Sequence, residues 1–316
     1  MCEHILLTIQ RRESAGSNRC TMDYLFTDLI GHETQTLYVI GNGFDLFHNI
    51  PSKYQNFYHW LKSIGEDEFV KNIESIWPQK FGDQSLLWYD FEKALETYDI
   101  DRLFNKYGGD YDIAWDEKVA TAAIEKIHPI IKDIPKKIKQ WAKSFDIVKV
   151  GPKLPLPTTS LYLTFNYTDT LEVVYKIPSD RICHIHGRCN KVDENILVGH
   201  HKMVPINQIE NKDYPFLEEQ GKINIAKEMN TLYKDCHANI DNNKRFFSLL
   251  KKMDRVVILG HSMSDIDLPY LGRIKNEVSQ DTHWFISKYC PSDEALIKRG
   301  LGALGIKDNN RWIINL

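Results

Sequence analysis

Short runs of apolar residues alternate along this chain with longer stretches in which apolar residues recur every three or four positions. The runs predict buried strands, because four or five consecutive apolar, often β-branched residues fit a sheet that is covered on both faces. They lie at residues 37–40, 160–164, 181–187, 255–259, 282–286 and 312–314, with 196–199 as a further candidate. The longer stretches predict amphipathic helices. The alternation predicts an α/β protein with a doubly wound, mostly parallel, Rossmann-like sheet.

The region between the first two predicted strands is rich in helical patterns. One apolar helix face runs from Tyr54 to Leu61, and a second covers about residues 116–145, where Pro129 and Pro135 should kink or break the helix. Residues 1–35 show no clear period. We therefore predict an N-terminal extension over residues 1–35 and a single α/β domain over 36–316, with a helical insertion at about 54–150 and a second helical segment at about 202–252.

Glycines and polar residues follow four of the predicted strands at the point where each strand ends. The four segments are Gly-Asn-Gly-Phe-Asp at 41–45, Phe-Asn-Tyr-Thr-Asp-Thr at 165–170, His-Ile-His-Gly at 184–187 and Gly-His-Ser at 260–262. The carboxyl ends of parallel strands meet at one edge of a sheet, where α/β proteins bind their ligands. Glycines after a first strand also allow the backbone to approach a phosphate, although the third glycine and the P-loop lysine are missing here. The pattern predicts a nucleotide site at this edge.

Composition and charge narrow the classes of function. The 316 residues are 42% hydrophobic and 26% charged, as in an ordinary soluble globular protein. The formal net charge of -3 argues against a surface that coats nucleic acid, since binding to phosphates needs an excess of lysine and arginine. One basic helix face exists, and we interpret it as a solvated face; it comprises Lys132, Lys136, Lys137, Lys139 and Lys143.

The cysteines and the absence of long apolar runs indicate the compartment. The 6 cysteines are scattered, and the chain shows neither a secretory signal pattern nor an uncharged stretch of the roughly 20 residues that span a bilayer. We expect a reduced, cytoplasmic protein without a membrane partner. A zinc site would have to use Cys183, His184, His186, Cys189, His200 and His201. Their spacing matches no standard zinc motif, so we expect no metal.

Five motifs together resemble the bacterial AbiH family. They are Gly-Asn-Gly-Phe-Asp-Leu at 41–46, Trp-Tyr-Asp-Phe-Glu at 88–92, the segment 164–172, His-Ile-His-Gly at 184–187, and Gly-His-Ser at 260–262 with Asp265 and Asp267. The family is named for abortive infection, in which an infected cell stops growing or dies before phage can spread. The resemblance extends from about residue 36 onward and implies a role in phage defence.

A more distant resemblance links the same segments to the sirtuin-type NAD-binding fold, which includes bacterial defence proteins that hydrolyse NAD. It implies that Gly41 and Gly43 approach the pyrophosphate, that Asn166 and His186 are the catalytic asparagine and general base, and that Gly260 and Ser262 contact the adenosine. To these we add Asp45 as a third catalytic candidate and Asn42, Asp169, Gly187 and Asp265 as further binding candidates. The zinc-binding cysteine pairs of sirtuin deacetylases are absent, which argues against deacetylation.

The residue types suit cleavage of the nicotinamide–ribose bond. Nicotinamide is already a cationic leaving group, so the site needs no strong acid and has only to hold the ribose and position a water or a ribose hydroxyl. A histidine can accept the proton at neutral pH, and an asparagine amide can orient the hydroxyl and the water. Asp45 would add electrostatic stabilisation or bind the ribose.

Three functions are therefore weighed. The first is a hydrolase that consumes NAD during infection, and the second is a sensor that binds NAD or a related nucleotide without turnover. The third is a toxin that targets RNA or DNA, supported only by the basic helix face. We favour the first, and do not expect a nucleic-acid partner. A lethal activity must stay silent until it is induced, so a homo-oligomer or a phage-derived activator is the other expected partner.

Overall fold

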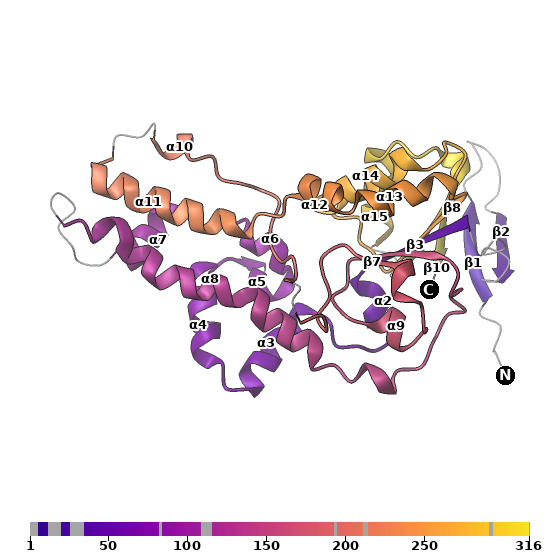
Figure 1. Cartoon of the computed structure of the whole chain (residues 1–316), viewed down its shortest axis with the longest axis horizontal. Helices are drawn as coiled ribbons and strands as arrows, with labels where there is room; N and C mark the ends of the chain where they lie inside the picture. Colours follow the sequence, from indigo (N-terminus) through magenta and orange to yellow (C-terminus); the bar gives the residue numbers. More distant parts are fainter. Residues whose placement is uncertain are drawn as a thin grey trace. The chain divides into compact units, whose positions relative to one another are not determined.

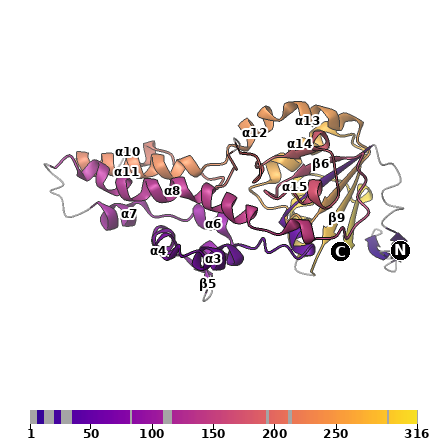
Figure 2. The ribbon, with the colours of Figure 1, turned by 60° about the horizontal axis from the view of Figure 1, so that its bottom comes forward.

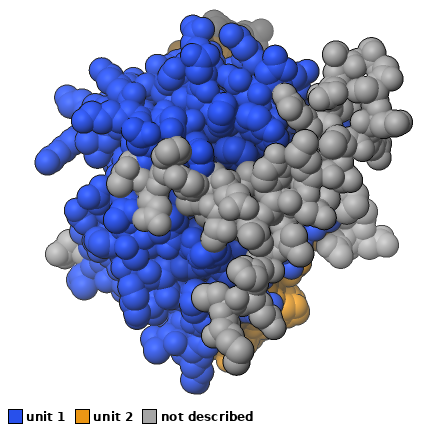
Figure 3. All heavy atoms as spheres, turned by 90° about the vertical axis from the view of Figure 1, so that its right-hand side faces the viewer, with its two compact units in different colours: residues 1–52, 142–194, 236–316 blue, residues 53–141, 195–235 orange. Residues whose placement is uncertain are grey.

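The computed structural model of the chain describes residues 6–11, 20–25, 35–81, 84–108, 116–192, 195–210, 214–290 and 293–315. The chain forms two compact units, which we call unit 1 and unit 2. Unit 1 comprises Met1–Ser52, Ala142–Glu194 and Cys236–Leu316 (blue in Figure 3), and unit 2 comprises Lys53–Trp141 and Asn195–Asp235 (orange). Each unit is thus built from separate stretches of sequence. The predicted plan of one domain with a helical insertion stays a prediction.

Unit 1 is built on one open sheet. Its parallel strands are β3 (Thr36–Ile40), β6 (Leu161–Thr164), β7 (Ile182–His184), β8 (Arg255–Leu259), β9 (His283–Lys288) and β10 (Arg311–Asn315). In space they follow the order β10-β9-β8-β3-β6-β7. β1 (Leu6–Arg11) and β2 (Cys20–Leu25) add an antiparallel pair beside β10, where Ile9 is the partner of Ile314. The predicted N-terminal extension therefore contributes two strands to the sheet.

The predicted fold class is confirmed, and six of the predicted strands occur. The third is shorter than the predicted 181–187, because β7 ends at His184 and the chain turns at Ile185 and His186. The candidate strand at 196–199 is wrong: these residues form no strand, and only the next residue, His200, makes an isolated bridge with Tyr233.

The order in which successive parallel strands are added to the sheet reverses at one point. β3 lies centrally, the strands β6 and β7 follow on one side, and β8, β9 and β10 follow on the other, which is the doubly wound order of dinucleotide-binding proteins. The reversal falls between β3 and β8. The turns that follow these two strands are the Gly41 and Gly260 segments, so the predicted nucleotide site lies where this fold binds its ligands.

Helices cover both faces of the sheet (Figures 1 and 2). The side chains of Leu37 and Val39 pack on one face, and those of Tyr38 and Ile40 pack on the other. The first face is covered by α12 (Cys236–Asn242), α13 (Lys244–Ser248), α14 (Leu268–Glu277) and α15 (Asp293–Ala303), the second by α2 (Asn42–Phe47) and α9 (Thr170–Val173). Because every residue of β3 is buried, its uninterrupted apolar run is explained by burial on two faces.

Unit 2 is helical. It contains α3 (Tyr54–Ser63), α4 (Asp67–Ile76), α5 (Leu86–Tyr89), α6 (Phe91–Leu95), α7 (Ile100–Tyr107), α10 (Asn207–Glu210), α11 (Phe216–Met229), most of α8 (Val119–Lys143) and the short strands β4 (Lys80–Phe81) and β5 (Gln84–Ser85). Pro129 and Pro135 lie inside α8, which continues through both positions (Figure 2), so of the predicted kink or break the break does not occur. Within the described ranges, no helix is both long and apolar enough to cross a bilayer.

The basic face of α8 is partly neutralised within unit 2. Lys136 donates to Asp133 at 2.6 Å, and Lys137 pairs with Glu66 on the segment before α4. Lys137 is also partly covered, with 18% of its side chain exposed. Part of this face therefore already has acidic partners in the protein.

Candidate functional site

Two glycine turns, after β3 and β8, pack directly against each other where the strand order of the sheet reverses. The Gly43 N–H donates to the Gly260 carbonyl at 2.8 Å, and the Gly41 N–H donates to Leu259 at 3.0 Å. Gly260 has a positive φ of 64°, and a Cβ added there would lie 2.1 Å from the Phe44 nitrogen. These glycines are needed for the close approach of two backbone segments. Gly41 and Gly43 were expected to approach a pyrophosphate, and in the structure their amides donate hydrogen bonds within the protein.

Asp45 projects from α2 into the interior beside these turns. Only 1% of the residue is exposed, and its two carboxylate oxygens accept hydrogen bonds from Thr168 at 2.7 Å and Thr170 at 2.8 Å. Burial raises the pKa of Asp45 from 3.8 to about 6, while the hydrogen bonds of the threonines and of Asn166 act in the opposite direction. A buried carboxyl group with a pKa near neutrality is typical of functional sites.

This raised pKa predicts that Asp45 destabilises the folded protein at neutral pH. The folded protein binds the Asp45 proton more tightly, so the group favours folding below about pH 3.8, and this stabilisation is lost as the pH rises through about 6. The difference corresponds to roughly 3 kcal/mol. Asp45→Asn should therefore unfold at higher urea concentration than the parent at pH 7.5, with a free energy of unfolding higher by up to that amount, and by about half as much at pH 5. A variant less stable than the parent at pH 7.5 would contradict this expectation.

Asn166 and Asp169 lie in the segment that follows β6. The Asn166 side-chain amide donates to the Gly41 carbonyl at 3.1 Å, and the residue is 8% exposed. Asp169 precedes α9 and is 3% exposed; its carboxylate accepts hydrogen bonds from Arg188 and Asn190, each at 2.5 Å. The Asn166 side chain therefore links the segment after β6 to the glycine turn at Gly41. The Asp169 side chain links the same segment to the residues after Gly187.

His186 lies opposite a carboxylate that it shares with a second histidine. Its Nε2 is 3.8 Å from Asp267 Oδ1, and His261 Nε2 is 3.4 Å from Asp267 Oδ2. Both rings pack on Phe165, with centroid distances of 5.2 Å and 4.5 Å. His261 Nδ1 accepts the Met263 N–H at 2.9 Å, so the neutral ring carries its proton on Nε2, facing Asp267. The arrangement is a buried carboxylate between two imidazoles, suited to holding or moving a proton.

The other predicted residues lie at the margin of this group. Gly187 adopts a positive φ of 82° in the turn after β7, which places His186 beyond the strand. Asn42 is exposed, and its side chain donates to Ser52 at 3.1 Å. Ser262 is also exposed, and Asp265 pairs on the surface with Arg299 at 3.2 Å. The structure does not bring these last three side chains to the histidines, and their binding roles stay predictions.

Asp267 is the residue that sequence reasoning missed. Both Asp265 and Asp267 belong to the family motif, but only Asp265 is among the predicted binding residues. The structure has Asp267 at the N-cap of α14, 9% exposed, where Ser264 donates to its Oδ2 at 3.2 Å. The available signal was its place directly before Leu268 and Pro269, since proline is frequent in the first helical turn and marks Asp267 as the residue at the helix start.

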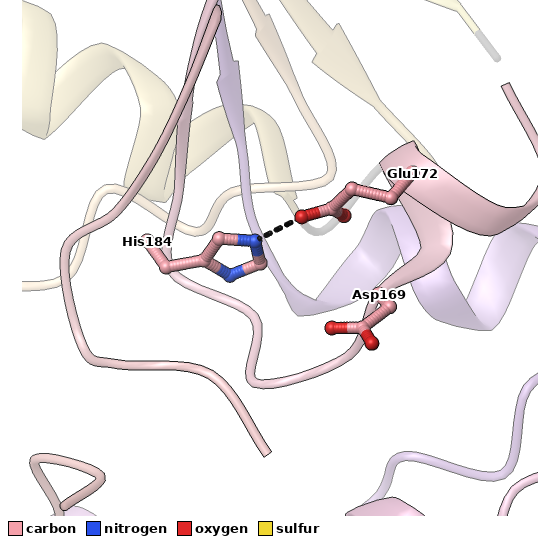
Figure 4. A group of neighbouring side chains, drawn as sticks. All are labelled: Asp169, Glu172 and His184. Carbon is pink, nitrogen blue, oxygen red and sulfur yellow. Dashed lines mark hydrogen bonds and ion pairs between the residues drawn. The ribbon is translucent and has the colours of Figure 1, made fainter. Parts of the chain in front are cut away.

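A second group, from β7 and α9, contains Asp169, Glu172 and His184 (Figure 4). One ligand atom from each lies within 4.8 Å of the others, and His184 Nε2 is 2.9 Å from Glu172 Oε1. Among the residues that the structure describes, this is the one group with the spacing of metal ligands, and of the six residues that a zinc site would have to use it contains His184 alone. Burial raises the pKa of the Cys189 thiol to about 12, which disfavours the thiolate that binds zinc.

The comparison with protein families agrees with the motifs. A family model described as "Bacteriophage abortive infection AbiH" matches residues 37–288, which begin at β3 and end with β9. No curated protein matches the chain. The matched region contains the glycine turns, both histidines, Asp267 and the Asp169 group. It covers most of the chain and confirms the predicted family. The chain therefore belongs to the AbiH family of bacteriophage abortive infection proteins.

Proposed function

We propose that this abortive infection protein hydrolyses NAD at the nicotinamide–ribose bond. The site lies in unit 1, where the strand order of the sheet reverses between β3 and β8. The observation that carries the proposal is the placement of His186 opposite Asp267, at the carboxyl ends of strands in the order used by dinucleotide-binding proteins. A histidine beside a carboxylate is a common form of general base, and here the two atoms face each other at ion-pair distance, 3.8 Å, without a hydrogen bond. Membership of the family supports a role in phage defence and leaves the reaction open.

The proposed reaction needs one water and one base. As nicotinamide leaves with the bonding electrons, water attacks the ribose carbon, and His186 accepts the proton that the water loses. The products are ADP-ribose, nicotinamide and a proton. Asp267 would orient the imidazole and stabilise its charged form, while His261, with its Nε2 proton facing the same carboxylate, would hold Asp267 in place.

The proposal is tested by measuring NAD and nicotinamide by mass spectrometry after incubation with the purified protein. We expect His186→Ala to reduce turnover at least about 100-fold, the usual contribution of a general base, and Asn166→Ala to reduce it as well. His237→Ala is the matched control, because His237 is exposed on α12 in the same unit. Turnover that survives in His186→Ala would refute the assignment of the base.

A second candidate, a nucleotide sensor without turnover, is supported by the hydrogen bonds of Asn166. Its side-chain amide already donates to the Gly41 carbonyl, so it acts in holding the glycine turn. The same assay separates the two functions. NAD that remains intact but raises the melting temperature of the parent would favour the sensor, whereas intact NAD without any thermal shift, also after extract of phage-infected cells has been added to supply an activator, would refute both.

A further inference from the structure

The side chains of Asp169, Glu172 and His184 bring three possible metal-ligand atoms within 4.8 Å of one another. His184 Nδ1 lies 3.3 Å from the Asn166 carbonyl oxygen, and since a carbonyl can only accept, this nitrogen carries the proton. Nε2 of the neutral ring is then a lone pair, and it faces Glu172 Oε1 at 2.9 Å. Two acceptors face each other at this distance (Figure 4). Either a second proton on the imidazole, which makes this an ion pair, or a metal ion joins the two atoms.

The surroundings favour a metal ion. Metal-binding histidines usually donate their other ring N–H to a carbonyl, as His184 does to Asn166. Among the described residues, the second oxygen of Glu172, Oε2, is buried and has no hydrogen-bond partner, and 11% of the side chain is exposed. Ligand bonds of about 2.1 Å at right angles put neighbouring ligand atoms about 3 Å apart, close to the observed separation of His184 and Glu172.

Arg188 is the cation that now serves the two carboxylates. Its Nε donates to Asp169 Oδ1 at 2.5 Å, and its Nη1 is 3.4 Å from Glu172 Oε1. The side chain is 26% exposed, so it can leave toward solvent without a change of the fold. A metal ion and this guanidinium would use the same oxygens, and binding of one opposes binding of the other.

We propose that Asp169, Glu172 and His184 bind one divalent first-row transition metal ion in competition with Arg188. Two carboxylates suit Mn²⁺, and the imidazole extends the choice toward iron and zinc and away from Ca²⁺ and Mg²⁺. Water would complete the coordination. The site is separate from His186 and Asp267, and the inference does not rest on the proposed hydrolysis of NAD.

The test is a titration of the full-length protein, first freed of metal with a chelator, with Mn²⁺ alone. The electron paramagnetic resonance signal of free Mn²⁺ falls as the ion binds. We expect one saturable site per chain, weakened at least about 10-fold in Glu172→Gln and in His184→Ala. Arg188→Ala should bind Mn²⁺ more tightly, by roughly five-fold, because a partly exposed competing charge has been removed.

The opposite directions of these effects make the test specific. Glu277→Gln is the matched control, since Glu277 lies in the same unit, pairs with Arg273, and has 14% of its side chain exposed. Its affinity should equal that of the parent. Absence of saturable binding in both the parent and Arg188→Ala would overturn the proposal, as would binding that Glu172→Gln leaves unchanged. If His184→Ala fails to fold, the glutamine and arginine variants still decide the result.

Discussion

Gly260→Ala is expected to destabilise the folded protein by at least about 4 kcal/mol. Two costs combine. A residue with a Cβ loses about 1–2 kcal/mol in the left-handed conformation that Gly260 adopts at a φ of 64°. The new Cβ would also meet the Phe44 nitrogen at 2.1 Å, a backbone atom that cannot move aside without breaking the contact between the two glycine turns. Urea denaturation followed by tryptophan fluorescence measures the loss.

Gly305→Ala is the control that separates the two costs. Gly305 has nearly the same φ, 63°, but an added Cβ there would have no neighbour within 4 Å among the described residues. We expect a loss of only about 1–2 kcal/mol, from the conformation alone. Equal losses in the two variants would mean that the turns separate readily, and that the packing of Gly260 on Gly43 contributes little.

Asp267→Asn is expected to reduce the proposed NAD hydrolysis by about 100-fold to 10,000-fold, once turnover by the parent has been established. The amide cannot stabilise a charged imidazole, and it would leave His186 and His261 without their shared carboxylate. The loss should appear in kcat, with KM within a few-fold of the parent. Steady-state kinetics, together with an unchanged melting temperature, distinguish this positioning role from a general loss of structure.

Asp265→Asn, two residues away, provides the control. Asp265 lies on the surface in an ion pair with Arg299, and 62% of its side chain is exposed. We expect its kinetics to match those of the parent. If Asp265→Asn were the damaging change and Asp267→Asn the silent one, the choice made from the sequence alone would be correct and the carboxylate between the histidines would have no part in the reaction.

The strands could be predicted because burial on two faces leaves a plain trace in the sequence. β8, Arg-Val-Val-Ile-Leu, has four buried residues in succession, and its predicted bounds are those observed. The third strand was predicted too long because a histidine that continues an alternating pattern cannot be distinguished from one in a following turn. Gly187, with its positive φ, ends the alternation two residues too late to signal that the strand stops at His184.

The site was harder to predict than the sheet. Position at a strand end selected Asn166, Asp45 and His186 as candidates, because topology alone brings strand ends together, and their roles stay predictions. Topology does not determine which side chain turns inward. That depends on contacts such as the packing of Phe165 between two imidazoles, and on a cap residue whose hydrogen bonds come from outside its own helix. The pairing of Arg188 with Asp169 likewise has no periodic signature.

The discontinuous make-up of unit 1 has a consequence for synthesis on the ribosome. Thr36 in β3 has Arg255 in β8 as its sheet partner, and between them the chain leaves unit 1 for unit 2 and returns, twice. A nascent chain therefore holds β3 without its partner β8 until Arg255–Leu259 has been translated, and Asp267 emerges later still. Such distant pairing slows folding. It also means that a product terminated before Asp267 lacks the complete histidine site, so any activity of that site requires translation past this residue.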